Sequence, residues 1–210
     1  MIFVRHIEFI VEEPSMETFL NTLLPRILGD IPFTIHAFQS KVELLKKLPA
    51  RLKGYARWLP EDYRLVVLVD RDDDDCIELK RKLEDYALKV GLPTRSNPRG
   101  NHFLVVNRIV VEELEAWYFG DWEAVTSAYP KVSAAVVRRP SFRNPDGIKG
   151  GTWEIFQREL QRAGYYKSGL PKREVAAKIA RHMDPGRNTS RSFQHFRDVL
   201  WEFVNSPRSA

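Results

Sequence analysis

Residues 64–75 read RLVVLVDRDDDD, and this stretch determines how the rest of the chain is interpreted. Positions 65–69 are apolar without a break, which is typical of a central parallel strand buried on both faces. Asp70 and Asp72 follow at the carboxyl end of that strand. Open parallel sheets bind their ligands outside this end of the strands. The stretch therefore predicts an α/β sheet with an acidic site at its edge.

Strand and helix patterns alternate on both sides of this stretch. Strands are expected at residues 3–11, 33–39, 64–70 and 102–111. Helices are expected from Ser15 to Gly29, at residues 41–58 and 75–90, and around residues 112–120. Ser15 is the expected N-cap of the first helix. The repeated order predicts an α/β fold: an open, mainly parallel sheet flanked by helices.

The second expected helix shows a clear apolar spacing. Its inward face is expected to consist of Val42, Leu45, Leu48 and Leu52. Pro49 lies within the same segment and lacks a backbone N–H, so it predicts a kink or a split.

The chain changes character after residue 130. A basic loop at 138–151 precedes three expected helices, at 152–163, 171–183 and 190–204, and no further strand follows. We therefore expect an α/β core at residues 1–130 and an α-helical C-terminal extension at residues 131–210. The extension carries several aromatic residues, so it is expected to pack on the core.

Composition limits the class of protein. The 210 residues are 43% hydrophobic and 29% charged, as in a globular domain. No apolar run approaches the ~20 residues of a membrane span, and charged residues interrupt the N-terminal segment, so neither a membrane protein nor a signal peptide is expected. The single cysteine excludes an intrachain disulfide and favours a reducing, cytoplasmic location.

Charge is distributed unevenly along the chain. Residues 131–210 hold 16 Lys and Arg against 7 Asp and Glu, whereas residues 1–130 hold 17 against 21. A basic extension beside an acidic core indicates a polyanionic partner such as nucleic acid, although a solvated basic face has the same composition. The residues expected to contact phosphates are Arg138, Arg139, Arg143 and Lys149, with Arg95 and Arg99 from an earlier loop.

Acidic residues follow three of the expected strands. Glu12 and Glu13 follow the first strand, and Glu112, Glu113 and Glu115 follow the fourth. Parallel strands bring their carboxyl ends to one edge, so Glu12 and Asp70 are expected to converge there. Carboxylates held together repel one another, and Mg²⁺ or Mn²⁺ would neutralise them. The alternatives are an N-capping role for Asp74 and Asp75, and a surface position for Glu13 or Glu115.

Several other site types do not fit. Counted from Asp70, a calcium loop would need Gly at the sixth position and Glu at the twelfth, where Asp75 and Arg81 stand. The chain has no P-loop, no dinucleotide-binding fingerprint and no serine-hydrolase elbow.

A glutamate after the first strand and an Asp-x-Asp pair after a later strand resemble the Toprim fold of topoisomerases, bacterial primases and overcoming-lysogenization-defect (OLD) nucleases. Residues 11–17, VEEPSME, resemble its first motif: Glu12 matches the motif glutamate, Glu13 stands in place of the usual glycine, and Glu17 is a candidate for the trailing acid. Asp70 and Asp72 match the Asp-x-Asp pair.

A second likeness extends over nearly the whole chain. The stretches ELEAWYFGD, GGTWE, GYYKSG and SFQHFRDVL resemble a bacterial family catalogued as domain of unknown function 4276 (DUF4276). That family is similar to Toprim nucleases, and some of its members lie beside ATPases in phage-defence loci. The resemblance therefore implies nucleic acid, and in addition an ATPase, as partners.

The resemblance implies a Mg²⁺- or Mn²⁺-dependent nuclease site. Glu12 would be a general base or a metal ligand, and Asp70 and Asp72 would hold one magnesium ion. Glu115, with Glu17 as a further candidate, would complete a second metal position.

OLD-type nucleases also use a lysine near the scissile phosphate. Lys167 is the candidate for that catalytic role, with Lys149 as an alternative. An ordinary surface lysine would look the same in the sequence.

Two other functions compete with a nuclease acting on DNA or RNA. A non-catalytic Toprim-like module that binds nucleic acid or an ATPase is compatible with Glu13 at the glycine position. A haloacid-dehalogenase phosphatase and a glycosyltransferase rank lower, because the Asp-x-Asp pair follows the third strand and because 210 residues leave little room for a sugar-nucleotide domain.

Overall fold

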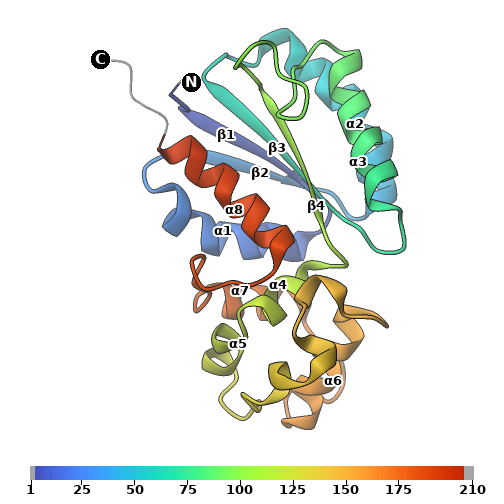
Figure 1. Cartoon of the computed structure of the whole chain (residues 1–210), viewed down its shortest axis with the longest axis vertical. Helices are drawn as coiled ribbons and strands as arrows, with labels where there is room; N and C mark the ends of the chain where they lie inside the picture. The colour runs from blue at the N-terminus through green and yellow to red at the C-terminus, as the bar shows by residue number, and fades with distance from the viewer. Residues whose placement is uncertain (1–2, 206–210) are drawn as a thin grey trace.

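A four-stranded sheet forms the centre of the computed structural model, which describes residues 3–205. Its strand order is β2-β1-β3-β4, and every neighbouring pair is parallel (Figure 1). The strands are β1 (His6–Val11), β2 (Phe33–Ala37), β3 (Tyr63–Asp70) and β4 (Val105–Val110). Each agrees with its predicted strand to within three residues at either end. The predicted open, parallel α/β sheet is therefore confirmed.

Helices cover both faces of this sheet. The helices are α1 (Pro14–Leu28), α2 (Lys41–Trp58), α3 (Cys76–Lys89), α4 (Leu114–Gly120), α5 (Trp122–Ala128), α6 (Thr152–Arg162), α7 (Lys172–Ala180) and α8 (Arg191–Val204). Helices α2 and α3 lie on one face, and α1 and α8 lie on the other (Figure 1). None of the helices within residues 3–205 combines the length and apolarity that crossing a bilayer requires.

Strand β3 is buried on both faces, as its unbroken apolar run predicts. Val66 and Leu68 belong to the hydrophobic core on the α1 and α8 side, while Leu65, Val67 and Val69 belong to the core beneath α2 and α3. All five side chains are at most 1% exposed. Each such side chain contributes roughly 1.5–3 kcal/mol on burial, so the central strand is anchored from both sides.

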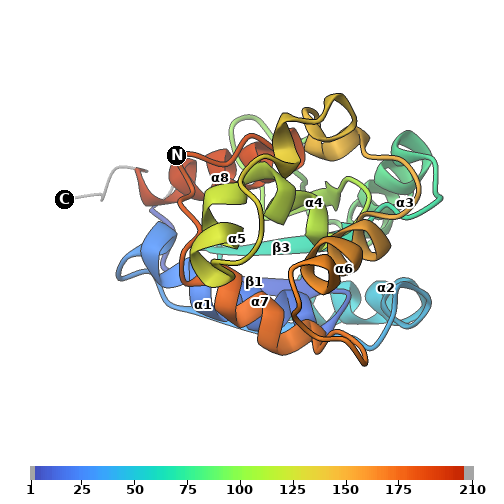
Figure 2. The ribbon, with the colours of Figure 1, turned by 90° about the horizontal axis from the view of Figure 1, so that it is seen from below.

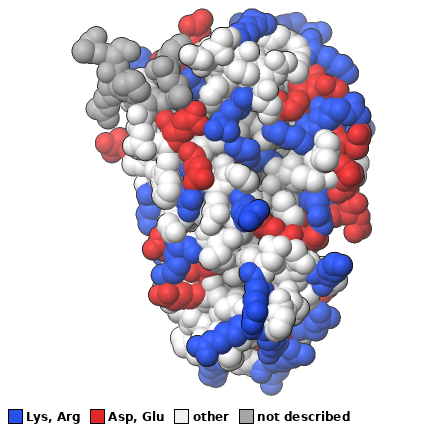
Figure 3. Space-filling view, viewed as in Figure 1, with Lys and Arg blue, Asp and Glu red and all other residues white. Residues whose placement is uncertain are grey.

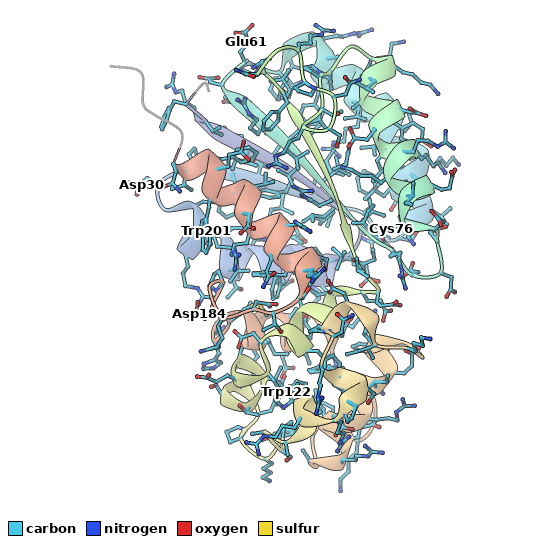
Figure 4. The ribbon with its side chains drawn as sticks, viewed as in Figure 1. Asp30, Glu61, Cys76, Trp122, Asp184 and Trp201 are labelled. Atoms are coloured by element: carbon cyan, nitrogen blue, oxygen red, sulfur yellow. The ribbon has the colours of Figure 1, made fainter. Side chains whose placement is uncertain are left out.

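The C-terminal part of the chain lies beyond the carboxyl ends of the strands and then returns to the sheet. Helices α4 to α7 gather at that end, and α8 runs back along the sheet (Figures 1 and 2). Trp117 of α4 stacks on Phe196 of α8 at 5.3 Å, and its indole N–H donates to Ser192 Oγ at 2.9 Å. Trp122 lies between α5 and α6 (Figure 4), with its ring 6.3 Å from that of Phe156. The boundary at residue 130 stays a prediction.

One glycine permits a close backbone approach between these parts. A Cβ on Gly120, at the end of α4, would lie 2.1 Å from Asn188 Oδ1 and 2.9 Å from the backbone nitrogen of Ser190. The backbone N–H of Thr189 donates to the Gly120 carbonyl at 2.9 Å. The segment before α8 is thus fastened to α4.

The expected inward face of α2 was partly wrong. Val42 is 77% exposed, and Leu44 is fully buried in its place. The row that faces the sheet consists of Leu44, Leu48, Leu52 and Tyr55. These residues recur at four-, four- and three-residue steps, which follows the helical repeat better than a row that begins at Val42. Pro49 lies inside one unbroken helix, so the expected split does not occur.

The start of α1 also differs from the expectation. Glu13, not Ser15, occupies the N-cap, and the Ser15 hydroxyl donates to Glu13 Oε2 at 2.8 Å. Pro14 takes the first helical position, where its fixed φ is favourable and its missing N–H costs nothing. The N-cap therefore lies two residues earlier than expected.

Candidate metal centre

Strands β1 and β3 deliver two buried carboxylates to the same edge of the sheet. Val11 pairs with Leu68, so Glu12 and Asp70 come at the adjacent carboxyl ends of the two strands. The backbone N–H of Asp70 donates to Glu12 Oε2 at 3.0 Å. The two residues are 7% and 8% exposed. The structure thus brings together the pair for which the sequence predicted convergence.

Burial makes the ionised forms of these carboxylates costly. Desolvation raises the pKa of Glu12 from 4.5 to about 7, with a further contribution from Asp72. Desolvation, followed by repulsion from Glu12 and Glu115, raises the pKa of Asp70 well above its ordinary value. A divalent cation would remove both penalties, because it favours the charged form and supplies the missing counter-charge.

Glu115, on α4, is a third buried acid at this edge. It is 4% exposed, and desolvation followed by repulsion from Glu113 raises its pKa from 4.5 to about 8. Its charge also acts on Asp70. The oxygen-only donors of Glu12, Asp70 and Glu115 suit Mg²⁺ or Mn²⁺. However, within residues 3–205 no three acidic, histidine or cysteine side chains are close enough together to enclose a metal ion.

Asp72 forms an ion pair with a lysine. Its carboxylate is 2.7 Å from the ammonium of Lys41, the first residue of α2. Its side chain is 46% exposed, and its φ of 47° is left-handed. The Asp-x-Asp pair is therefore divided between a buried carboxylate and one that faces a lysine.

The loops after β3 and β4 are fastened to each other. Arg71 donates its backbone N–H to Val110 O at 2.8 Å, and Asp72 donates its own to Glu112 O at 3.2 Å. The Arg71 guanidinium also forms an ion pair with the Glu112 carboxylate. Glu112, like Asp72, has a positive φ, of 63°. Left-handed non-glycine residues cost roughly 1–3 kcal/mol each and concentrate at functional sites.

Lys172, at the start of α7, reaches the same edge from the C-terminal part. Its ammonium is 3.5 Å from Glu13 Oε2 and 4.6 Å from the centre of the Trp153 ring. Burial opposes its charged form, but the charges of Glu115, Glu13 and Glu113 prevail and raise its pKa. Glu113 is bonded to the N-terminus of α6: its Oε2 accepts hydrogen bonds from Thr152 Oγ1 and from the Trp153 N–H, each at 2.9 Å.

The protein-family model described as "Domain of unknown function (DUF4276)" matches residues 11–201. The chain belongs to this family. Among solved structures, this DUF4276 chain is similar to the C-terminal region of the Burkholderia pseudomallei OLD protein, at 18% identity and a TM-score of 0.45, over 94% of this chain and 99% of that chain. It is also similar to the C-terminal region of the Xanthomonas campestris pv. campestris OLD protein, at 15% identity and a TM-score of 0.41, over 94% of each chain. No curated protein matches the sequence.

Three further residues suggested by the resemblance make no hydrogen bond or ion pair with Glu12, Asp70 or Glu115 within residues 3–205 of the DUF4276 chain. Lys167 is exposed between α6 and α7, and Lys149 is exposed before α6. Neither makes an ion pair within the described residues. Glu17 is half-buried in the first turn of α1 and is not among the charges that act on Glu12 or Asp70. Their assigned roles stay predictions.

The basic residues expected to bind phosphates fall into two groups. Arg138, Arg143 and Lys149 are exposed in the segment between α5 and α6, where Figure 3 shows positive charge at the lower end of the molecule. Two others are engaged: Arg95 pairs with Glu202 at 2.9 Å, and Arg139 pairs with Glu159 at 2.9 Å. Arg99 donates to the Gly91 carbonyl at 3.0 Å.

Sequence reasoning missed both lysines of the centre. Lys41 comes four residues after Ala37, the last residue of β2, so it lies at the same sheet edge as the acids. Glu12 and Asp70 were identified because residues after parallel strands gather at one edge of the sheet. The same argument applied to basic residues would have found Lys41. No comparable signal exists for Lys172, which is 159 residues from Glu13 in the chain.

Proposed function

We propose that this protein is a divalent-metal-dependent nuclease that hydrolyses phosphodiester bonds of DNA or RNA. The observation that carries the proposal is the Glu12–Asp70 pair: two buried carboxylates on adjacent parallel strands, joined by one backbone hydrogen bond. No Lys or Arg within residues 3–205 makes an ion pair with either carboxylate. A buried acidic pair without a direct counter-ion is costly unless a cation completes it.

The residues at this edge can each be given a role. A bound Mg²⁺ or Mn²⁺ would stabilise the charge that develops on the phosphoryl oxygens. Glu12 and Asp70 would hold that ion, with Glu115 nearby. In the alternative role that the resemblance implies, Glu12 would act as the general base instead of holding the ion. Lys172 would contact a phosphate oxygen, the role for which the sequence suggested Lys167.

The positive segment between α5 and α6 supports a nucleic-acid substrate. Arg138, Arg143 and Lys149 have no acidic partner within the described residues, so their charges are free to contact backbone phosphates. The family's similarity to Toprim nucleases beside ATPases supports a phage-defence effector that works with an ATPase.

The decisive experiment compares three proteins on supercoiled plasmid and on total tRNA, with Mg²⁺ or Mn²⁺ present or removed by EDTA. These are the wild type, Asp70→Asn and Asp73→Asn. Asp73 is an exposed acid of the same loop, so it is the matched control. We expect metal-dependent cleavage that falls at least ~100-fold in Asp70→Asn and is unchanged in Asp73→Asn.

Two results would contradict the nuclease proposal. Equal cleavage by Asp70→Asn and wild type would show that the pair is not the catalytic centre. Metal-independent nucleic-acid binding without cleavage would instead indicate a non-catalytic module.

A further inference from the structure

Lys41 is held by three acceptors next to the metal centre. Its Nζ lies 2.7 Å from Asp72 Oδ2, 3.0 Å from Asp74 Oδ2 and 2.8 Å from the carbonyl oxygen of Arg71. An ammonium group has three N–H donors, so these contacts use all of them. The side chain is only 13% exposed. Lys41 is therefore an integral cation of the loop after β3, and not a solvated surface charge.

The rest of the loop keeps Asp72 turned toward Lys41. The left-handed φ of Asp72 and the hydrogen bond from its N–H to Glu112 O set the backbone direction. The preceding residue, Arg71, donates its N–H to Val110 O of β4. The Asp72 carboxylate consequently has a cation partner within the protein, which it shares with Asp74. Glu12 and Asp70 have no such direct partner among the described residues, whereas the charge of Lys172 acts on Glu115, the third buried acid of this edge.

Charge balance shows what this arrangement can accommodate. Glu12 and Asp70 carry two negative charges when ionised, which one divalent cation would balance. Lys41 already supplies a positive charge to Asp72 and shares it with Asp74. A second divalent cation at Asp72 would have to displace an ammonium that already makes three short contacts, and it would compete with that charge at close range.

We propose that Lys41 takes the place of a second metal ion. The centre binds one divalent cation, at Glu12 and Asp70, and Lys41 pairs with Asp72 and excludes a second cation from it. This inference rests on the proposed metal-dependent function, and it specifies a one-ion centre where the family resemblance implies two metal positions. Lys41 acts through Asp72 and the loop, so it is a positioning residue.

Counting bound ions tests this directly and requires no cleavage. Equilibrium dialysis against Mn²⁺, followed by elemental analysis, measures the number of ions per chain. We expect one ion for the wild type. Removing even a residue that only hydrogen-bonds a metal ligand lowers metal affinity ~10-fold to ~100-fold. If the Mn²⁺ affinity of Asp72→Asn changes by less than ~3-fold, Asp72 is therefore not a ligand.

Variants of Lys41 provide the second half of the test. Lys41→Met should gain a second ion, and the double variant Lys41→Met/Asp72→Asn should lose it again. Lys41→Arg keeps the charge and should still bind one ion, which guards against a folding defect. The matched control is Lys47→Met, because Lys47 is an exposed lysine of the same helix that pairs only with Glu43.

The outcomes separate this inference from the nuclease proposal. Three results would each overturn the role of Lys41 and leave the metal-dependent function standing. They are two ions in the wild type, a ~10-fold or greater loss of metal affinity in Asp72→Asn, and a Lys41→Met protein that gains no ion at millimolar Mn²⁺. No bound ion in the wild type would overturn both.

Discussion

Replacing the buried Glu115 by glutamine removes one ionisable group and keeps the shape of the side chain. In the folded protein the pKa of Glu115 is about 8, and its ordinary value is 4.5. Between these values the folded state binds a proton that the unfolded state has released. The free energy of unfolding therefore falls as the pH rises. The contribution of Glu115 protonation to the free energy of unfolding is complete below pH 4.5 and is lost as the pH rises through about 8.

The size of this effect follows from the shift. One pKa unit corresponds to about 1.4 kcal/mol, so at pH 7 the wild type has lost about 3 kcal/mol relative to pH 4.5 through this group alone. The side chain is 4% exposed, so solvent screening does not reduce the figure much. For a chain of this length, 1 kcal/mol shifts the melting temperature by about 2–4 °C. The glutamine variant should thus gain several degrees over wild type at pH 7.

Thermal unfolding in EDTA at pH 5, 6, 7 and 8 measures this difference. Glu12 contributes a slope of the same sign to both proteins, so the difference between variant and wild type reports Glu115 together with its effect on Asp70. The advantage of Glu115→Gln should grow up to about pH 8 and then level off. Glu61→Gln, at the exposed Glu61 (Figure 4), is the control and should follow the wild-type slope. A stability difference that is constant or shrinks with pH would refute the reasoning.

Further predictions concern the metal, the lysine at the centre, the core and the basic segment. Saturating Mg²⁺ should raise the melting temperature more at pH 8 than at pH 6, because the ion must displace protons from the buried acids; calorimetry in both buffers checks this. Lys172→Met should lower cleavage ~10-fold to ~100-fold in a plasmid assay while Lys167→Met leaves it unchanged. Gly120→Ala should destabilise the fold by about 1–3 kcal/mol in urea unfolding, because its Cβ would meet Asn188 and Ser190. Arg143→Gln should weaken nucleic-acid binding and reduce its salt dependence by about one ion in fluorescence anisotropy.

Local patterns predicted the sheet because each strand carries its own signal. The apolar run before Asp70 requires burial on both faces, and only a strand between two helical layers provides it. The same sequence placed Glu12 and Asp70 together, since neighbouring parallel strands end at one edge. Asp75 also has the predicted capping role, accepting the backbone N–H groups of Ile77 and Glu78 at 2.9 Å.

The inward face of a helix and its N-cap were less predictable where two candidate residues lie only two positions apart. Val42 and Leu44 are both apolar, and only the packing of α2 on the sheet decides that Leu44 is buried. Ser15 is a good capping residue, but Pro14 starts the helix before it. In both cases the intrinsic preferences of the residues were similar, and tertiary contacts selected between them.

The sequence by itself determined the parallel α/β sheet, its acidic edge and the pairing of Glu12 with Asp70. These follow from periodicity and from the geometry that all parallel strands share. Only the tertiary structure decided which charges are compensated there. Lys41 meets Asp72 because the starts of α2 and α3 lie side by side, and Lys172 meets Glu13 because α7 returns to α1. Contacts between such distant positions depend on how the helices pack, and no local pattern records them.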